Sequence, residues 1–282
     1  MITKIIHEDK IQKAHKYIEK GESFVIVTHV SPDGDAIGSA LGLFHFLNAY
    51  GKENVSVIVP NDYPNFLKWM PGTKDVTIYE KYPEFSEQLI SDADVIFCLD
   101  FNDPKRIEKL ADPVLKSEAR KVLIDHHLHP VEFCNVTMSY PNISSTSEMV
   151  FRFICRMGLF DLIDKNAAEC IYTGMMTDTG AFTYNSNHPE IYTIIGELIK
   201  LGIDKDLIYR RINQVYSEGR LRLMGYVLYE KMKVHHDMQA AMIALSVDEL
   251  NRFNYQTGDT EGFVNLPLSI EGVSFSVFIR ED

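Results

Sequence analysis

Short apolar runs that stop abruptly at acidic residues or histidines, separated by helix-like stretches, fill the first two-thirds of the chain. The runs "SFVIVTH", "DADVIFCLD" and "RKVLID" end at His29, Asp100 and Asp125. Each has the length and apolar content of a buried strand, whereas "DAIGSALGLFHFLNAYG" has the pattern of an amphipathic helix that ends at Gly51. Strands alternating with helices predict an α/β fold, with a mostly parallel sheet covered by helices on both faces.

The pattern changes after about residue 188, which suggests more than one domain in the 282 residues. We expect a first domain at 1–188, a helical connector at 189–230 and a smaller α/β domain at 231–282. The smaller domain has two strand-like runs, a short helix and a last alternating strand, "GVSFSVFIRED". Because that strand lacks a following partner, we expect the smaller domain to be incomplete.

The composition of the chain limits the classes of binding partner and the cellular compartment that we expect. The formal net charge of -12 opposes binding of long duplex nucleic acid or of an anionic membrane surface. The four cysteines have no CxxC spacing, which favours a reducing compartment. The sequence has neither a signal-peptide core nor an apolar run long enough to span a membrane, so we expect a cytoplasmic protein. The helical middle is compatible with a homodimer and equally with a monomer.

Four polar clusters follow the predicted elements. The clusters are "HVSPDGD" with His29, Asp33 and Asp35, then Asp100 in "CLDF", then Asp125, His126 and His127 in "DHH", and Asp178 in "TDTGAF". The carboxyl ends of parallel strands share one edge of a sheet, where α/β proteins bind ligands. Carboxylates and imidazoles in this number match what two adjacent divalent cations need.

Each cluster also has a plain structural interpretation when taken alone. Asp33 and Asp35 are typical turn and N-cap residues before a helix. Asp178, before Gly180, could be a turn carboxylate. Asp100 is harder to explain in this way, since an acid directly after a buried strand needs a partner.

The motifs "HVSPDGDAIGS", "CLDF", "DHH" and "TDTGAF", in this order, resemble the four motifs of the DHH phosphoesterase superfamily. The segments "SSTSEMV" and "TEGFVNLPLSIEGV" resemble its nano-RNase type, the bifunctional oligoribonucleases and 3'-phosphoadenosine-5'-phosphate phosphatases. These proteins pair a DHH domain with a DHH-associated domain. A glycine-rich motif with a histidine, found in relatives near the end of that second domain, is missing from this chain.

The resemblance implies a role for each motif residue. His29 and Asp33 would hold one metal, Asp35, His126 and Asp178 the other, and Asp100 both. Asp125 would orient the neighbouring ligands, and His127 would face the scissile phosphate; Asp100, Asp125 and His127 are therefore the expected catalytic residues. The donor set favours two Mn²⁺ ions, with Mg²⁺ or Co²⁺ as alternatives.

The expected function is hydrolysis of short single-stranded RNA, with a nucleoside bisphosphate as a further substrate. Turnover of cyclic or linear dinucleotides and a non-catalytic nucleotide sensor are the alternatives, and "SSTSEMV" argues against a pyrophosphatase. Ser145 and Thr146 begin a helix whose N–H groups could bind a substrate phosphate, although Ser145 and Glu148 also fit a capping box. Arg280 could bind a terminal phosphate or be a solvated residue.

Overall fold

A computed structural model of the protein describes residues 4–281. Within these residues the chain forms two compact units. The first comprises residues 4–63 and 67–211, and the second comprises residues 64–66 and 212–281. The helices Pro189–Lys200 (α7) and Lys205–Asn213 (α8) thus lie in the first unit or at its end, and Glu218–Tyr226 (α9) lies in the second.

A parallel sheet forms the centre of the first unit. In spatial order its strands are β3 (Val76–Ile78), β2 (Asn54–Val59), β1 (Ser23–Val27), β4 (Val95–Leu99), β5 (Arg120–Asp125) and β6 (Val136–Ser139). All neighbouring pairs in it are parallel. The strand order reverses between β1 and β4, and open α/β sheets bind ligands at such a switch point. The predicted α/β fold with a parallel sheet is confirmed.

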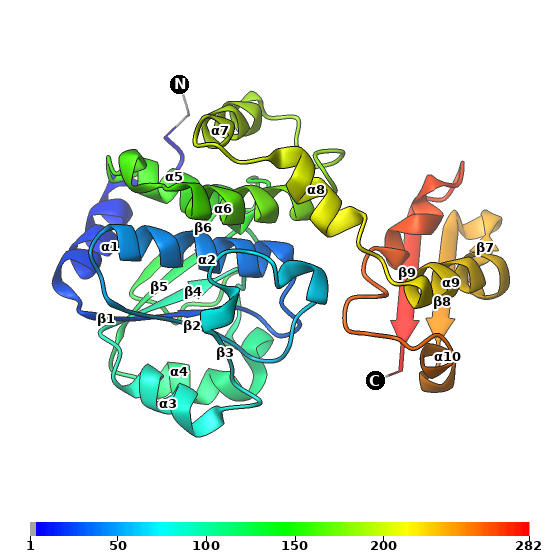
Figure 1. Ribbon diagram of the computed structural model, residues 1–282, viewed down its shortest axis with the longest axis horizontal. Coiled ribbons are helices and arrows are strands. Elements are labelled where there is room, and N and C mark those ends of the chain that lie inside the picture. Colours follow the sequence, from blue (N-terminus) through cyan, green and yellow to red (C-terminus); the bar gives the residue numbers. More distant parts are fainter. Residues whose placement is uncertain (1–3, 282) are drawn as a thin grey trace. The chain divides into compact units, whose positions relative to one another are not determined.

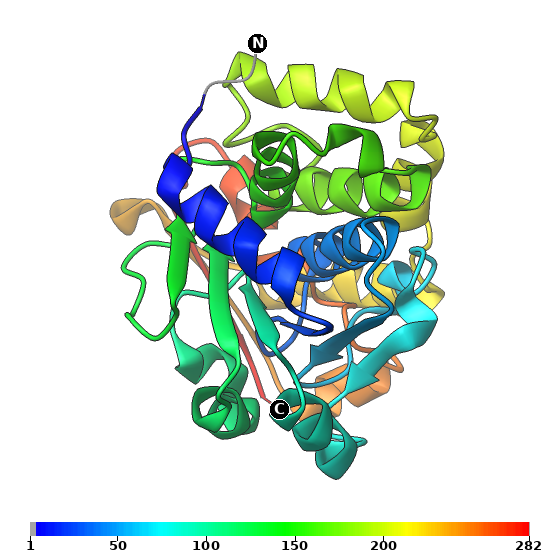
Figure 2. The same ribbon diagram turned by 90° about the vertical axis from the view of Figure 1, so that its left-hand side faces the viewer.

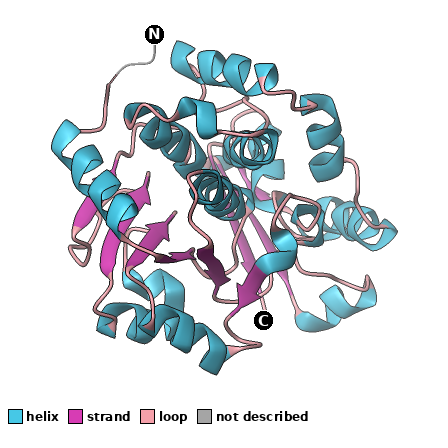
Figure 3. Cartoon of the chain, turned by 60° about the vertical axis from the view of Figure 1, so that its left-hand side comes forward, coloured by secondary structure: helices cyan, strands magenta, loops and turns pink. Residues whose placement is uncertain are grey.

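Helices cover both faces of this sheet, as shown in Figures 1 and 3. The helices on one side are α2 (Gly34–Ala49), α5 (Thr146–Arg156) and α6 (Lys165–Asp178), and those on the other are α3 (Pro83–Ser91) and α4 (Ala111–Lys116). The first helix, α1, spans Glu8–Lys20, and α7 lies outside α5 and α6 (Figure 2). Val25 and Val27 of β1 pack with Ile90 of α3 and Val114 of α4 in a buried apolar cluster.

Close packing of α2 against α6 matters most for the site. Gly38 of α2 faces the α6 backbone so closely that a Cβ there would lie 2.6 Å from the carbonyl oxygen of Cys170 and 2.8 Å from the nitrogen of Gly174. The helices run in opposite directions, because Gly34 faces Thr177 while Gly42 faces Ile171. The start of α2 therefore lies beside the end of α6.

The second unit is built on a small sheet of three strands, β7 (Lys233–His235), β8 (Ala240–Leu245) and β9 (Phe275–Arg280). The pairing is antiparallel between β7 and β8 and parallel between β8 and β9. Helices α9 and α10 (Val247–Arg252) contribute Leu223 and Leu250 to a core that includes Ile243 and Phe263. Among the helices of the described residues, none has the length and apolar character needed to cross a lipid bilayer.

Candidate metal centre

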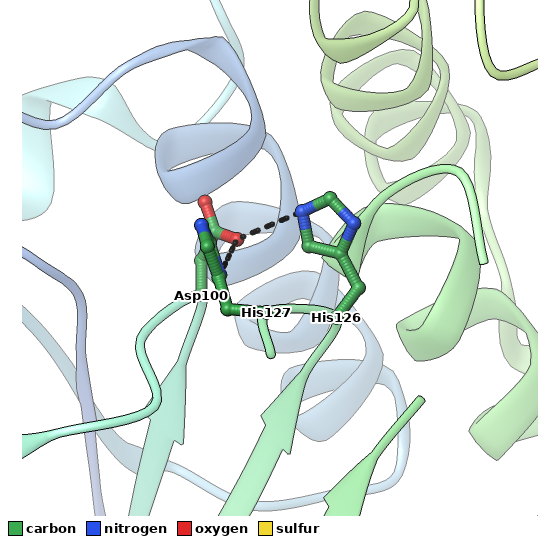
Figure 4. Close-up of side chains that lie close together, drawn as sticks. All are labelled: Asp100, His126 and His127. Carbon is green, nitrogen blue, oxygen red and sulfur yellow. Dashed lines mark ion pairs between the residues drawn. The ribbon is translucent and has the colours of Figure 1, made fainter. Parts of the chain in front are cut away.

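Asp100 lies directly after β4, between the ends of β1 and β5. Its backbone has a φ of 66°, and its N–H donates to the carbonyl oxygen of Ile124 on β5 at 3.1 Å. Such left-handed backbone is uncommon outside glycine, although Asp tolerates it better than most residues. The buried Asp100 carboxylate faces the two rings that follow β5, with Oδ1 3.7 Å from His126 Nε2 and 3.8 Å from His127 Nδ1 (Figure 4).

The other Asp100 oxygen faces the residues that follow β1. Oδ2 lies 3.4 Å from Nε2 of His29, and the same nitrogen lies 3.8 Å from Oδ1 of Asp33. Asp33 is also the N-cap of α2, because Oδ1 accepts hydrogen bonds from the N–H groups of Asp35 and Ala36, both at 3.0 Å. Its two proposed roles, helix cap and site residue, are compatible.

A second group forms around His126. Its Nε2 lies 3.9 Å from Oδ2 of Asp35 and 3.5 Å from Oδ2 of Asp178. Asp35 lies in the first turn of α2 and Asp178 is the last residue of α6, so the close packing of these helices brings the two carboxylates together. The structure thus places all six predicted ligand residues in groups whose ligand atoms lie within 4.8 Å of one another, namely His29, Asp33 and Asp100, and Asp35, His126 and Asp178. Asp100 also groups with His126 and His127.

The histidine rings are oriented as metal-binding histidines generally are. Nδ1 of His29 lies 2.8 Å from the carbonyl oxygen of Val30, and Nδ1 of His126 lies 3.2 Å from that of Ile143. A ring nitrogen beside a carbonyl oxygen carries a proton, so Nε2 is the nitrogen of each ring that faces the carboxylates. Nε2 of His29 is buried without a hydrogen-bond partner among the described residues. A buried nitrogen that no protein donor satisfies fits a bound cation.

The charge balance of the site also favours cations. Burial raises the pKa of Asp35 well above its usual range, and the carboxylates of Asp100 and Asp178 raise it further. Burial raises the pKa of Asp178 to about 7 against the lowering effect of His126. Burial opposes protonation of His29, but the Asp100 and Asp33 carboxylates raise its pKa to about 10. Carboxylates this close together hold protons unless a cation offsets their charge.

Asp125, fully buried at the end of β5, orients His127. Its Oδ1 lies 2.7 Å from the ring Nδ1 of His127, and its Oδ2 accepts the backbone N–H of His127 at 2.9 Å. The hydrogen bond to Asp125 raises the pKa of His127, although burial lowers it. The His127 side chain is 34% exposed, so it is accessible at the surface of the site. Asp125 thus contacts both the ring and the backbone of His127, and its predicted role in orienting the neighbouring ligands stays a prediction.

The start of α5 differs from the prediction of free N–H groups. The N–H groups of Thr146 and Ser147 already donate to Asp35, at 2.6 Å to Oδ2 and 2.8 Å to Oδ1. Ser145 caps the helix by accepting the N–H of Glu148 at 3.0 Å. The capping box is incomplete, however, because the Glu148 carboxylate accepts the N–H of Ser144 at 3.1 Å instead of that of Ser145. A buried carboxylate, Asp35, takes the donors that we had expected to bind a phosphate.

Arg280 lies on β9 of the second unit. Its Nη1 donates to the hydroxyl oxygens of Tyr255 at 2.5 Å and Thr260 at 3.3 Å. Its guanidinium also lies 5.3 Å from the centre of the Tyr255 ring. The side chain is therefore held by neighbours in its own unit, and its predicted contact with a substrate phosphate stays a prediction.

Comparisons with known proteins identify the family of the chain. The model of the DHH family, N-terminal domain, matches residues 23–175. The chain is 32% identical to the bifunctional oligoribonuclease and PAP phosphatase NrnA of Thermus thermophilus, over 91% of this chain and 72% of that protein. It is 25% identical to the probable bifunctional oligoribonuclease and PAP phosphatase NrnA of Streptococcus mutans, over 94% of this chain and 79% of that protein.

The chain is also similar to a solved structure. The crystal structure of an exopolyphosphatase-related protein from Bacteroides fragilis superposes with a TM-score of 0.95 and 59% identity, over 100% of this chain and 82% of that one. The fold and the site thus define a phosphoesterase, a hydrolase with residues suited to divalent metal. The chain belongs to the DHH family, and within it the chain is NrnA-like.

Proposed function

We propose that the protein is a phosphodiesterase that uses two Mn²⁺ ions to hydrolyse short oligoribonucleotides and 3'-phosphoadenosine-5'-phosphate. The observation that carries the proposal is the position of Asp100, whose two carboxylate oxygens face two different groups of potential ligands. A carboxylate shared in this way is suited to hold two cations side by side. Similarity to proteins named as oligoribonucleases and PAP phosphatases supports the choice of substrates.

The residues that would hold the cations are His29 and Asp33 on one side, Asp35, His126 and Asp178 on the other, and Asp100 between them. Bound there, two divalent cations would lower the pKa of a water molecule and offset the charge that develops on the phosphate. The protein's part is to hold the carboxylates and the two Nε2 atoms close together in one place. The carbonyl oxygens beside both rings contribute to this by accepting a hydrogen bond from Nδ1, which turns Nε2 towards the carboxylates.

We propose that the His127 side chain contacts the scissile phosphate. Asp125 holds the proton on Nδ1 and raises the pKa of the ring, which favours the cationic form. A cationic imidazole beside the phosphate would stabilise the negative charge of the transition state and could donate a proton to the leaving oxygen. Asp125 acts through His127, since it is fully buried and bonded to it.

The preference for short substrates follows from charge. A net charge of -12 repels a long polyanion, whereas a site that concentrates cations can still bind one end of a short one. Cyclic dinucleotides contain the same kind of bond, so they belong among the substrates to be tested.

Hydrolysis of a labelled RNA 5-mer, 3'-phosphoadenosine-5'-phosphate, pApA and a cyclic dinucleotide, with Mn²⁺ and with excess chelator, tests the proposal. We expect turnover of the 5-mer and the bisphosphate with Mn²⁺ and none with chelator. Turnover of the cyclic dinucleotide alone would replace the proposal with second-messenger hydrolysis. Binding of all four without turnover would identify a sensor instead.

The variant His127→Ala tests the role of that ring. We expect kcat for the 5-mer to fall about 100-fold, because one stabilising group is lost from the transition state. The number of bound Mn²⁺ ions should not change. His129→Ala, which removes an exposed histidine two residues away, is the matched control. Equal activity of the two variants would remove His127 from the mechanism.

A further inference from the structure

The first residue of α5 contacts two site carboxylates that lie far from it in the sequence. The backbone N–H of Thr146 donates to Oδ2 of Asp35 at 2.6 Å, and its hydroxyl donates to Oδ1 of Asp100 at 2.8 Å. Thr146 is fully buried, so water does not compete for either bond. One residue thus fixes the position of two acids that come from α2 and from the end of β4.

The two oxygen atoms held by Thr146 are those that face His126. Nε2 of His126 lies 3.9 Å from Oδ2 of Asp35 and 3.7 Å from Oδ1 of Asp100. The other Asp100 oxygen, Oδ2, faces His29 instead, and none of the hydrogen bonds found for Thr146 in the described residues reaches it. The contacts of Thr146 are therefore confined to one of the two ligand groups.

The helix end that presents Thr146 is itself fixed. The Oγ of Ser145 accepts the N–H of Glu148, and the Glu148 carboxylate accepts both the N–H and the hydroxyl of Ser144. Arg152, one turn further on, lies 2.7 Å from Oε1 of Glu148 in a buried ion pair. An N-terminal turn held by a cap and a buried ion pair has little freedom to move, so the Thr146 donors keep their direction.

We infer that Thr146 is a positioning residue that presets two oxygen ligands of the metal bound at His126, and that it does not contact the substrate phosphate. The inference rests on the proposed metal site. A carboxylate oxygen has a second lone pair, so a hydrogen bond from Thr146 leaves each oxygen able to bind a cation. Groups that orient metal ligands in this way typically contribute a factor of about 10 to 100 to metal affinity.

The test is calorimetric titration of the purified chain with Mn²⁺ in the absence of substrate. Thr146→Val keeps the backbone N–H and the shape of the side chain but removes the hydroxyl, whereas Thr146→Ser keeps the hydroxyl. We expect Thr146→Val to weaken one of two binding events about 10-fold and to leave the other unchanged. Thr146→Ser should restore both to within about twofold of wild type.

Thr173→Val is the matched control. The Thr173 hydroxyl is also fully buried, but it donates to the carbonyl oxygen of Glu169 within α6 at 2.7 Å. Thermal unfolding of Thr146→Val and Thr173→Val shows whether both fold, and Thr146→Ala replaces the valine variant if it does not. Unchanged Mn²⁺ affinity in Thr146→Val, or an equal loss in Thr146→Ser, would overturn the inference.

The same variants distinguish a failure of the inference about Thr146 from a failure of the proposed function. Selective loss of one Mn²⁺ event in a protein that hydrolyses none of the tested substrates would support the role of Thr146 and refute the function. Hydrolysis of the 5-mer with a wild-type Mn²⁺ isotherm in Thr146→Val would support the function and refute the role. At saturating Mn²⁺, kcat of Thr146→Val should recover to within about threefold of wild type with KM unchanged; a raised KM would instead indicate substrate contact and overturn the inference.

Discussion

Replacing Gly38 with alanine should destabilise the first unit and disturb the site together. The added Cβ would lie 2.6 Å from the carbonyl oxygen of Cys170, about 0.8 Å inside the 3.4 Å at which ordinary contact begins. Because the obstacle is helix backbone, α2 and α6 would have to separate. Overpacking of this kind costs about 1–3 kcal/mol, and the better helix propensity of alanine returns about 1 kcal/mol. The net loss is up to about 2 kcal/mol, or up to roughly 8 °C in the unfolding temperature of a unit of this size.

The same substitution at Gly196 is the control. Gly196 lies within α7, and nothing stands within 4 Å of a Cβ added there. Gly196→Ala should therefore stabilise the chain by about 0.5–1 kcal/mol through helix propensity alone. Thermal unfolding and Mn²⁺ titration of both variants check the reasoning. An equal gain in stability at the two positions would refute the argument that α2 and α6 pack too closely for a side chain at Gly38.

Three further predictions concern the ligands, the metal and the second unit. If the proposed two-cation site is right, Asp100→Asn should lower kcat at least about 100-fold, because it would alter the ligand shared by both cations, whereas Asp103→Asn, at the N-cap of the 3₁₀ helix Pro104–Leu110, should not. Mn²⁺ at 100 times its Kd should stabilise the fold by about 2.7 kcal/mol per site, as measured by denaturant unfolding, and chelator should reverse the effect. Hydrogen bonds from Lys231 and Tyr226 lower the pKa of Glu249 to about 2. Its contribution to stability is therefore complete above its usual pKa of 4.5 and lost as pH falls towards 2. Glu249→Gln should accordingly lower the unfolding temperature at pH 7 but make little difference at pH 2.

The fold was predictable wherever periodicity is strong. The buried strands β1 and β4 contain continuous apolar runs and β5 a shorter one at 122–124, and in each the run stops where the sequence turns polar. Neither β3 nor β6 is predicted above. Val76–Ile78 has three half-buried residues and Val136–Ser139 has four of mixed burial, so neither carries a distinctive pattern. Their place at the edges of the sheet is decided by the neighbouring strands, which local sequence does not encode.

The residues that gather at the site could be chosen from the sequence, but the hydrogen bonds that hold them in place could not. Asp100 stands out because a carboxylate directly after a buried strand has few alternative partners, whereas Asp33 could be explained equally well as a helix cap. The bonds made by Thr146 span 111 residues to Asp35 and 46 to Asp100, so only the folded chain brings the partners together. The sequence at the start of a helix does not show whether its N–H groups bind a phosphate or a carboxylate, because the same groups can bind either anion.

The start of α5 explains how acids can be buried before a cation arrives. Burial removes water from Asp35, which raises its pKa. Two N–H groups at a helix N-terminus oppose this effect by donating hydrogen bonds that stabilise the charged carboxylate. The charge of the His29 ring, whose Nε2 lies 3.4 Å from Oδ2 of Asp100, holds the pKa of Asp100 below the usual range despite burial. Hydrogen bonds from the start of α5 thus replace water at both carboxylates, and oxygens that accept them still face the His126 ring. Binding of divalent metal then adds charge compensation to a site already folded, so the secondary structure should persist in chelator while metal-dependent turnover is lost.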